Sequence, residues 1–345
     1  MNKSIMFKEI TSQSEKIKNC YEANKDLISL IGRTIKIFKP INIILVGRGT
    51  SLNSIYYAKE MLEIYYNVPV SIANPSVFTI YNSSLNMEKT LVIAISQSGK
   101  GKDIFKVVES ANKAGALTIA ITNEKNSILA KEANYNLYNE VEKAVSYAAT
   151  KTYTSTMYLL TKLIFEISDI SELDLNDNDV FEAINNGINY YEQIKKDIVM
   201  FKNYNNAFCL SRGYSISLAE ELALKLKETC HYPVSAYKSS EFYHGPIASV
   251  SKNTPSFIFA IEEKTNPNNL KLINDLKSLG SFTYVITNKG DILNASENGI
   301  YISESNDLLA MFTAIVVMQL LVCELSLSLG YNPDFMKVLE HIDTI

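Results

Sequence analysis

The sequence predicts an α/β fold made of two successive copies of one unit, each a parallel β-sheet covered by helices on both sides. Short apolar runs alternate with longer helical patterns, as in parallel sheets whose strands are joined by helices. Several short segments recur in the same order 164 or 165 residues later. The chain of 345 residues also exceeds one ordinary core and suits two domains of roughly 150 to 190 residues each.

The first copy is expected over residues 39–170, after an N-terminal helical segment at 1–38. Its first strands are predicted at NIILVG (42–47), LVIAI (91–95) and LTIAI (117–121), and its first helices at 52–66 and 103–115. The strand segments are apolar on both faces, which is typical of a sheet buried between two layers. The second of these helices has an acidic start at Asp103 and a stop at Gly115.

The second copy is expected over residues 203–345, after a helical linker at 171–202. The recurring segments are VGRGTS (46–51) with LSRGYS (210–215), PVS (69–71) with PVS (233–235), and ITNEKNSIL (from 121) with ITNKGDIL (from 286). Duplication of a single α/β unit is the most economical explanation of this order.

Composition narrows the class of partner. The net charge of −4 shows no basic excess, so a nucleic-acid partner is not expected, and small molecules or locally held anions fit better. The four cysteines lack CxxC spacing, and no metal site is expected. Scattered cysteines and an N-terminus without an apolar signal core predict a protein of the reducing cytoplasm.

One uncharged stretch, residues 308–323, resembles a membrane span in composition. It has only sixteen residues, includes Thr313 and Gln319, and ends at Glu324. A helix buried in a core or a subunit interface is therefore expected, and no membrane partner.

The segment SQSG follows the second strand of the first copy. A strand that ends in Ser96, Gln97, Ser98 and Gly99 before a helix offers hydroxyl groups, backbone N–H groups and the positive end of a helix dipole, which together suit a phosphate. An ordinary βα turn explains the same residues about equally well. Thr50 and Ser51 follow the first strand and are expected at the same carboxyl edge, where such folds bind ligands. A dinucleotide is disfavoured because VGRGTSLN lacks the third glycine of that fingerprint.

Comparison of the two copies singles out residues that are titratable only in the second. Glu228 matches Ile64, and His244 matches Ile80. The alternative for Glu228 is a salt-bridged solvent face with Glu221 and Lys225, and a lone histidine beside a turn is usually structural. A carboxylate and an imidazole near a bound phosphate are nevertheless suited to moving protons beside a sugar carbonyl.

With these motifs placed, the chain resembles the SIS (sugar isomerase) family, and in particular the isomerase half of glucosamine 6-phosphate synthase and its stand-alone deaminase, deglycase and isomerase relatives. The motifs that carry the resemblance are FKEITSQ, GRGTS, SQSG, AATKTYT (148–154), ALKLKE and EFYHGP, in that order along nearly the whole chain. The resemblance implies two tandem SIS domains, each a three-layer α/β/α unit of flavodoxin-like type.

The resemblance also implies roles for residues. Thr50, Ser51, Ser96, Gln97, Ser98 and Gly99 would hold the phosphate of a hexose phosphate. Glu228 would shuttle a proton between C1 and C2, and His244, used in the family from the neighbouring subunit, would help to open the ring. Lys337 lies in the C-terminal tail where the synthase has an imine-forming lysine, and an ordinary surface lysine is the alternative.

Two departures from the family pattern affect the expected function. Lys100, Gly101 and Lys102 follow SQSG where the family has a further hydroxyl. Two explanations stay open: the ammonium of Lys102 compensates for the missing hydroxyl, or the ligand differs from that of the family. No glutaminase domain precedes the first copy in this sequence, so glutamine-dependent synthesis is not expected.

The expected function is that of a cofactor-free homodimeric enzyme, with active sites shared between subunits, which isomerises an aminosugar or fructosamine phosphate with loss of its amine. Two alternatives remain open: simple aldose-ketose isomerisation, and a phosphosugar-sensing regulatory protein without turnover. A nucleotide-dependent dehydrogenase on the same doubly wound plan would need a cofactor loop that the sequence does not show.

Overall fold

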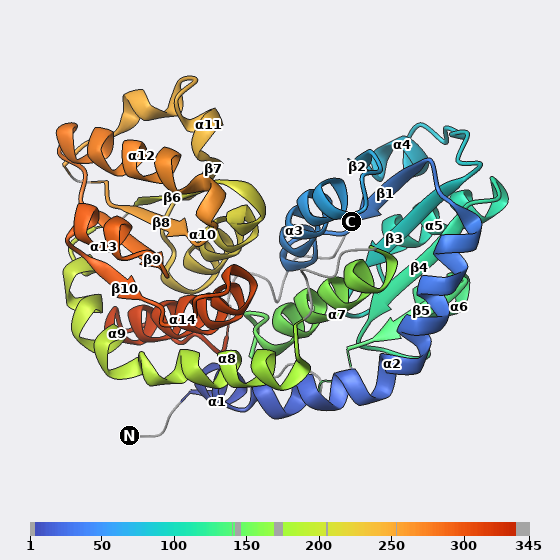
Figure 1. Ribbon diagram of the computed structural model, residues 1–345, viewed down its shortest axis with the longest axis horizontal. Coiled ribbons are helices and arrows are strands. Elements are labelled where there is room, and N and C mark those ends of the chain that lie inside the picture. The colour runs from blue at the N-terminus through green and yellow to red at the C-terminus, as the bar shows by residue number, and fades with distance from the viewer. Residues whose placement is uncertain are drawn as a thin grey trace. The chain divides into compact units, whose positions relative to one another are not determined.

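The computed structural model describes residues 4–139, 141, 146–168, 175–204, 206–252 and 254–335 (Figure 1). Its contacts divide the chain into two compact units. The first unit takes in the described residues of 15–143 and 151–174. The second unit takes in those of 1–14, 144–150 and 175–345.

The first unit contains a five-stranded parallel sheet in the order β2-β1-β3-β4-β5. Its strands are β1 (Asn42–Val46), β2 (Val70–Ile72), β3 (Thr90–Ile95), β4 (Leu117–Thr122) and β5 (Tyr135–Tyr138). The chain runs outward from β1 to β2 and then crosses to β3 on the other side of β1. The carboxyl ends of β1 and β3 therefore form a topological switch point, the place where open α/β sheets bind ligands.

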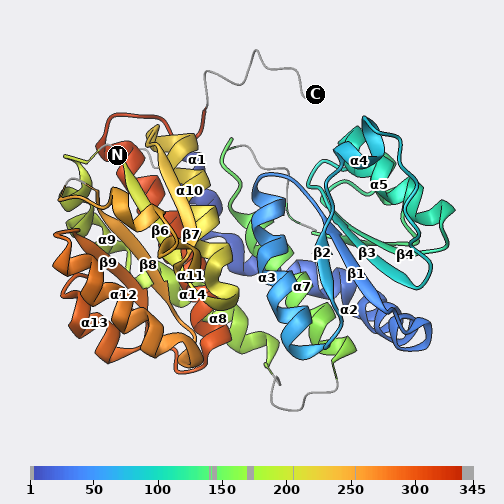
Figure 2. The ribbon, with the colours of Figure 1, turned by 90° about the horizontal axis from the view of Figure 1, so that it is seen from above.

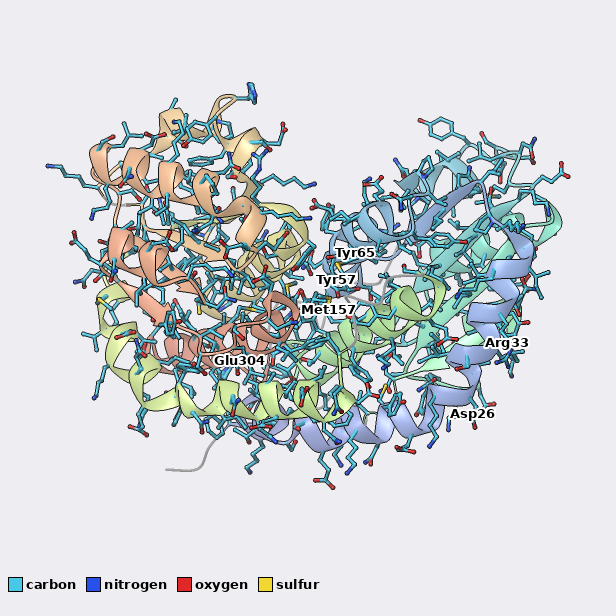
Figure 3. All side chains as sticks on the ribbon, viewed as in Figure 1. Asp26, Arg33, Tyr57, Tyr65, Met157 and Glu304 are labelled. Carbon is cyan, nitrogen blue, oxygen red and sulfur yellow. The ribbon has the colours of Figure 1, made fainter. Side chains whose placement is uncertain are left out.

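Helices cover both faces of this sheet (Figure 2). One core cluster joins the sheet to α4 (Ser76–Thr79), α5 (Lys102–Lys113) and α6 (Ile128–Glu132). The other face carries α2 (Gln13–Phe38), α3 (Thr50–Tyr65) and α7 (Lys151–Ile167). The Tyr57 hydroxyl on α3 lies 2.7 Å from that of Thr161 on α7, while the exposed side chains of Asp26 and Arg33 point outward from α2 (Figure 3).

The second unit repeats this topology in the order β10-β9-β8-β6-β7, with β6 and β8 at its switch point. The strands are β6 (Ala207–Ser211), β7 (Val234–Lys238), β8 (Ser256–Ala260), β9 (Thr283–Thr287) and β10 (Gly299–Tyr301). A core cluster joins one face to α11 (Ser239–Phe242), α12 (Asn266–Ser278) and α13 (Gly290–Ser296). The expected fold class, two parallel sheets each flanked by helices, is confirmed.

The other face of the second sheet is covered by α10 (Ile216–Cys230) and α14 (Asp307–Ser328). Outside them lie α8 (Asp177–Asn189) and α9 (Tyr191–Asp197), within the stretch expected to be a helical linker. In the described part of the chain, α14 alone is long and apolar enough to cross a membrane, but 89% of its most apolar window is buried. The expectation of a core helix is confirmed, because α14 packs against α8 and α10.

The short helix α1 (Ile5–Thr11) belongs to the second unit and is held by a residue from the far end of the chain. The carboxylate of Asp334 accepts hydrogen bonds from the backbone N–H groups of Ile5, at 2.8 Å, and Met6, at 2.7 Å. A carboxylate at a helix start satisfies unpaired N–H groups and complements the helix dipole. The two ends of the described chain are thereby joined within this unit.

Candidate functional site

The loop after β3 is fixed by backbone hydrogen bonds to the end of β4 and to the segment that follows it. The N–H of Ser96 donates to the carbonyl of Ile121 at 3.0 Å, and the carbonyl of Gln97 accepts from the N–H of Asn123 at 2.9 Å. The carbonyl of Gly99 accepts from the N–H of Leu129 at 3.2 Å. The loop conformation is therefore set by its neighbour in the sheet before any ligand arrives.

Gly99 is required where it stands. Its φ of +60° lies in the left-handed region, which favours glycine. A β-carbon added there would also overlap the side chain of Ser127, whose hydroxyl caps α6. Gly99 thus lets the loop turn tightly against α6.

The polar side chains of this loop face outward. Gln97 and Ser98 are exposed, Ser96 is half-buried, and the Ser98 hydroxyl accepts from the N–H of Lys100 at 3.3 Å. The hydroxyl of Ser96 and the amide of Gln97 make no hydrogen bond to the described part of the chain. They remain available for a ligand.

Thr50 and Ser51 form the first turn of α3, directly after β1, and both are half-buried. The structure therefore places all the predicted phosphate-binding residues after β1 or β3, at the switch point of the first unit. Arg48, after β1, forms an ion pair with Asp103 in the first turn of α5 and so ties the two loops together. Lys102 is the first residue of α5, and it is exposed.

The second unit holds a buried charge cluster on α10. The ammonium of Lys225 lies 3.0 Å from a carboxylate oxygen of Glu221 and 3.0 Å from one of Glu228. The side chains of Glu221 and Lys225 are each 1% exposed, whereas that of Glu228 is 20% exposed. The alternative of a solvent-exposed face is wrong for Glu221 and Lys225, and Glu228 is the member of the cluster that reaches the surface.

This cluster alters the acidity of its members. Burial is the main cause that raises the pKa of the Glu228 carboxyl; the Lys225 ammonium opposes the rise, and the Glu221 carboxylate adds to it. Burial disfavours the charge on Lys225, but the two carboxylates outweigh it and hold the pKa of Lys225 above its usual value. Glu228 is therefore a stronger base than an ordinary surface glutamate, as general acid–base catalysis near neutral pH requires.

Sequence reasoning missed Tyr147, which directly precedes the AATKTYT segment and is 46% exposed. Burial of its hydroxyl raises the pKa of the phenol, and the charge of Glu228 raises it further. Its backbone N–H donates to the carbonyl of Asp334 at 3.1 Å. The position of Tyr147 beside a recognisable motif was the only sequence signal for it.

The structure does not bring the other two predicted catalytic residues into contact with this cluster: one makes no polar contact with it, and the other is not described. His244 follows α11 and is exposed; its imidazole makes no hydrogen bond or ion pair within the described chain, including to Glu228. Lys337 lies outside the described residues. Among the described residues, no group of three His, Cys, Asp or Glu side chains is placed to hold a metal ion.

A model of the SIS domain matches residues 36–165 and 200–329. Among curated proteins, the chain is 27% identical over 339 residues to the glutamine–fructose-6-phosphate aminotransferase (isomerizing) of Thermococcus kodakarensis. That match covers 95% of this chain and 56% of the relative, so the chain spans about half the length of the curated relatives it matches.

Two solved structures share the fold. The C-terminal domain of glucosamine-fructose-6-phosphate aminotransferase from Francisella tularensis has a TM-score of 0.83 and 24% identity, covering 96% of this chain and 98% of that one. Glucosamine-6-phosphate deaminase from Thermotoga maritima has a TM-score of 0.74 and 22% identity, covering 96% and 97%. At such identities these structures show a common fold.

Proposed function

Since the chain belongs to the SIS domain family and carries two such domains, we propose that it is a sugar-phosphate enzyme that isomerises an aminosugar or fructosamine phosphate and releases its amine. The observation that carries this proposal is the carboxylate of Glu228, which is held at the surface end of a buried ion cluster and has a raised pKa. The names of the similar proteins, an aminotransferase that isomerises its sugar and a deaminase, agree with this chemistry.

The first unit is assigned the phosphate. Hydroxyl groups of Thr50, Ser51, Ser96 and Ser98 and the amide of Gln97 would donate to the phosphate oxygens. The start of α5 adds the positive end of a helix dipole, and the exposed ammonium of Lys102 adds a full charge. These groups orient the sugar without taking part in bond breaking.

The second unit is assigned the proton transfers. Glu228 as carboxylate would take the proton from one of the two carbons C1 and C2 of the open-chain sugar and return it to the other. Lys225 stabilises the carboxylate of Glu228 between these steps, while burial keeps this carboxylate basic. When the amine lies on the sugar, isomerisation gives an imine, and water then replaces the amine to leave the sugar phosphate and free ammonia or a larger amine.

The test is incubation with glucosamine 6-phosphate, measuring released ammonia and ketose phosphate, and with a fructosamine 6-phosphate, measuring released amine and aldose phosphate. The Glu228→Gln variant keeps the shape of the side chain and should lose the activity, whereas the Glu220→Gln variant on the same helix should retain it. If the protein isomerises a plain hexose phosphate and releases no amine, the assigned site residues stand, but the proposed substrate is wrong. Full activity of the Glu228→Gln variant would refute the assignment of the base.

We also propose that the working form is a homodimer in which His244 of one protomer serves the site of the other. The exposed imidazole, with no hydrogen-bond or ion-pair partner in the described part of its own chain, is free to reach a neighbour. Mixing and exchanging subunits of Glu228→Gln and His244→Ala variants, each inactive alone, should restore activity. Random exchange makes half of the dimers mixed, each with one intact site, and so gives roughly a quarter of native activity. If both groups came from the same chain, no site would be intact and no activity would return.

A further inference from the structure

The switch point of the second sheet, between β6 and β8, already contains an anion that belongs to the chain itself. Glu262 follows β8 and its side chain is buried, with 7% of the residue exposed. One of its carboxylate oxygens accepts from both the N–H and the hydroxyl of Ser215, each at 2.9 Å. Ser215 directly precedes α10, so the carboxylate lies at the start of a fifteen-residue helix.

The loop after β6 is shaped to hold this carboxylate. Gly213 has a φ of +79°, and a β-carbon at that position would overlap the carboxylate of Glu262. The carbonyl of Glu262 in turn accepts from the N–H of Thr265, at 3.0 Å, and from its hydroxyl, at 2.9 Å. Hydrogen bonds thereby hold both the side-chain carboxylate and the backbone carbonyl of Glu262.

The repeat relates these residues to the proposed phosphate site of the first unit. Ser215 corresponds to Ser51 at an offset of 164, and Glu262 corresponds to Gln97 at an offset of 165. In the first unit the amide of Gln97 makes no hydrogen bond to the described chain. In the second unit the corresponding side chain is a carboxylate that crosses to the other loop and binds it.

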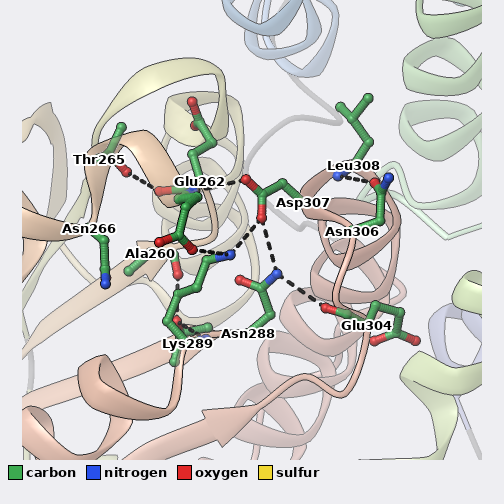
Figure 4. Close-up of polar contacts among 12 residues, drawn as sticks. Ala260, Glu262, Thr265, Asn266, Asn288, Lys289, Glu304, Asn306, Asp307 and Leu308 are labelled. Atoms are coloured by element: carbon green, nitrogen blue, oxygen red, sulfur yellow. Dashed lines mark hydrogen bonds and ion pairs between the residues drawn. The ribbon is translucent and has the colours of Figure 1, made fainter. Parts of the chain in front are cut away.

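Charged groups after β8 and β9 are also paired within the chain (Figure 4). The ammonium of Lys289, after β9, lies 2.7 Å from a carboxylate oxygen of Asp307 and 3.0 Å from one of Glu263. The N–H of Glu263 donates to Asp307 at 2.9 Å, and the amide of Asn288 donates to the carbonyl of Glu304 at 3.1 Å. The ammonium of Lys289 is therefore already paired with two carboxylates.

We infer that the carboxylate of Glu262 stands in the second unit where the first unit would hold a phosphate, so that the chain takes up a single phosphate group. The inference on stoichiometry rests on the proposed function of the first unit, but the assignment of Glu262 does not. Replacing Glu262 by a small residue removes the internal anion and leaves the donors of Ser215 open to an external one.

The test uses inorganic phosphate as the probe, with binding followed by ³¹P NMR and calorimetric titration on the full chain. The native chain should bind one phosphate, the Ser98→Ala variant should lose it, and the Glu262→Ser variant should bind two. In a chain that carries both Ser98→Ala and Glu262→Ser, one phosphate should bind. This last result separates the two proposals, because it does not depend on the first unit.

Two controls keep the result interpretable. Glu263→Gln changes the exposed neighbouring carboxylate and should leave the number of bound phosphates unchanged. Glu262→Gln keeps the volume of the side chain, so it should fold and still exclude phosphate. Two phosphates bound by the native chain, or none gained by a folded Glu262→Ser variant, would overturn the inference. If Glu262→Ser does not fold, the number bound by the native chain decides.

Discussion

Replacing Lys225 by methionine tests the charge cluster on α10 directly. The side chain is 1% exposed and its ammonium lies 3.0 Å from both Glu221 and Glu228, so the change leaves two carboxylates near one another without the cation between them. Removing one partner of a buried ion pair costs about 3–5 kcal/mol, because the remaining charge is uncompensated in a poorly solvated place. We expect a loss of this size in the free energy of unfolding at neutral pH.

The loss should depend on pH in a defined direction. The pKa of Glu228 is raised in the folded protein from its ordinary value of 4.5, mainly by burial, and Lys225 opposes that rise. A carboxyl with a raised folded-state pKa favours folding below its unfolded pKa, and this contribution is lost as the pH rises through the folded value. Without Lys225 the pKa of Glu228 rises further. The penalty of Lys225→Met should therefore be small below pH 4.5 and grow toward neutrality.

Urea unfolding of the native and variant proteins across this pH range measures the effect. Lys227→Met, on the same helix but at an exposed position, is the matched control and should stay within about 0.5 kcal/mol of the native protein. A loss below about 1 kcal/mol that does not change with pH is what an exposed ion pair would give. That result would refute the view that Lys225 compensates two buried carboxylates.

Two further substitutions test the loops of the first unit. Gly99→Ala should lower the free energy of unfolding by about 1–3 kcal/mol and weaken sugar-phosphate binding, because it adds both backbone strain and an overlap with Ser127. Gly115 has a φ of +78° with open space around it, so Gly115→Ala adds the strain alone. Thermal unfolding of the two variants separates the strain from the overlap. Asp103→Asn frees Arg48 and removes a negative charge beside the proposed phosphate site, so titration should show tighter binding of the sugar phosphate. The loss in stability should stay under about 1 kcal/mol. The control is Glu109→Gln, further along α5, which should leave the binding unchanged. Unchanged or weaker binding by Asp103→Asn would count against a phosphate at this edge.

Much of the fold was predictable because the sequence repeats, so that one half can be aligned with the other. The apolar runs at 42–47, 91–95 and 117–121 coincide with β1, β3 and β4 to within a residue at each end. Strands apolar on both faces need helices on both sides, and the repeated segments then predict a second sheet of the same kind.

The environment of the charged residues was not predictable in the same way. Glu221, Lys225 and Glu228 have the spacing of a solvent-exposed face, and helical periodicity alone cannot show that α14 covers part of α10. The hydrogen bond between Glu262 and Ser215 joins the loop after β8 to the loop after β6, and no local sequence pattern indicates it. Both features depend on tertiary packing between segments far apart in the chain.

The first copy forms the corresponding helix without buried charges. At an offset of 164, Glu221 and Lys225 correspond to Tyr57 and Met61 on α3, which are buried and uncharged, and Glu228 corresponds to the exposed Ile64. Replacing a complete buried ion pair by apolar residues is often neutral or stabilising by about 1–4 kcal/mol.

The double variant Glu221→Leu with Lys225→Met removes one buried carboxylate together with the cation, so it should recover most of the stability that Lys225→Met alone loses. Its turnover should nevertheless fall, because Glu228 has lost the cation that stabilises its carboxylate. Urea unfolding and the amine-release assay on the same samples decide this. A double variant as unstable as the single one would mean that the charges serve the structure. A stable double variant with native turnover would mean that Glu228 acts without them, and a stable but slow one shows that the second copy keeps its buried charges for chemistry.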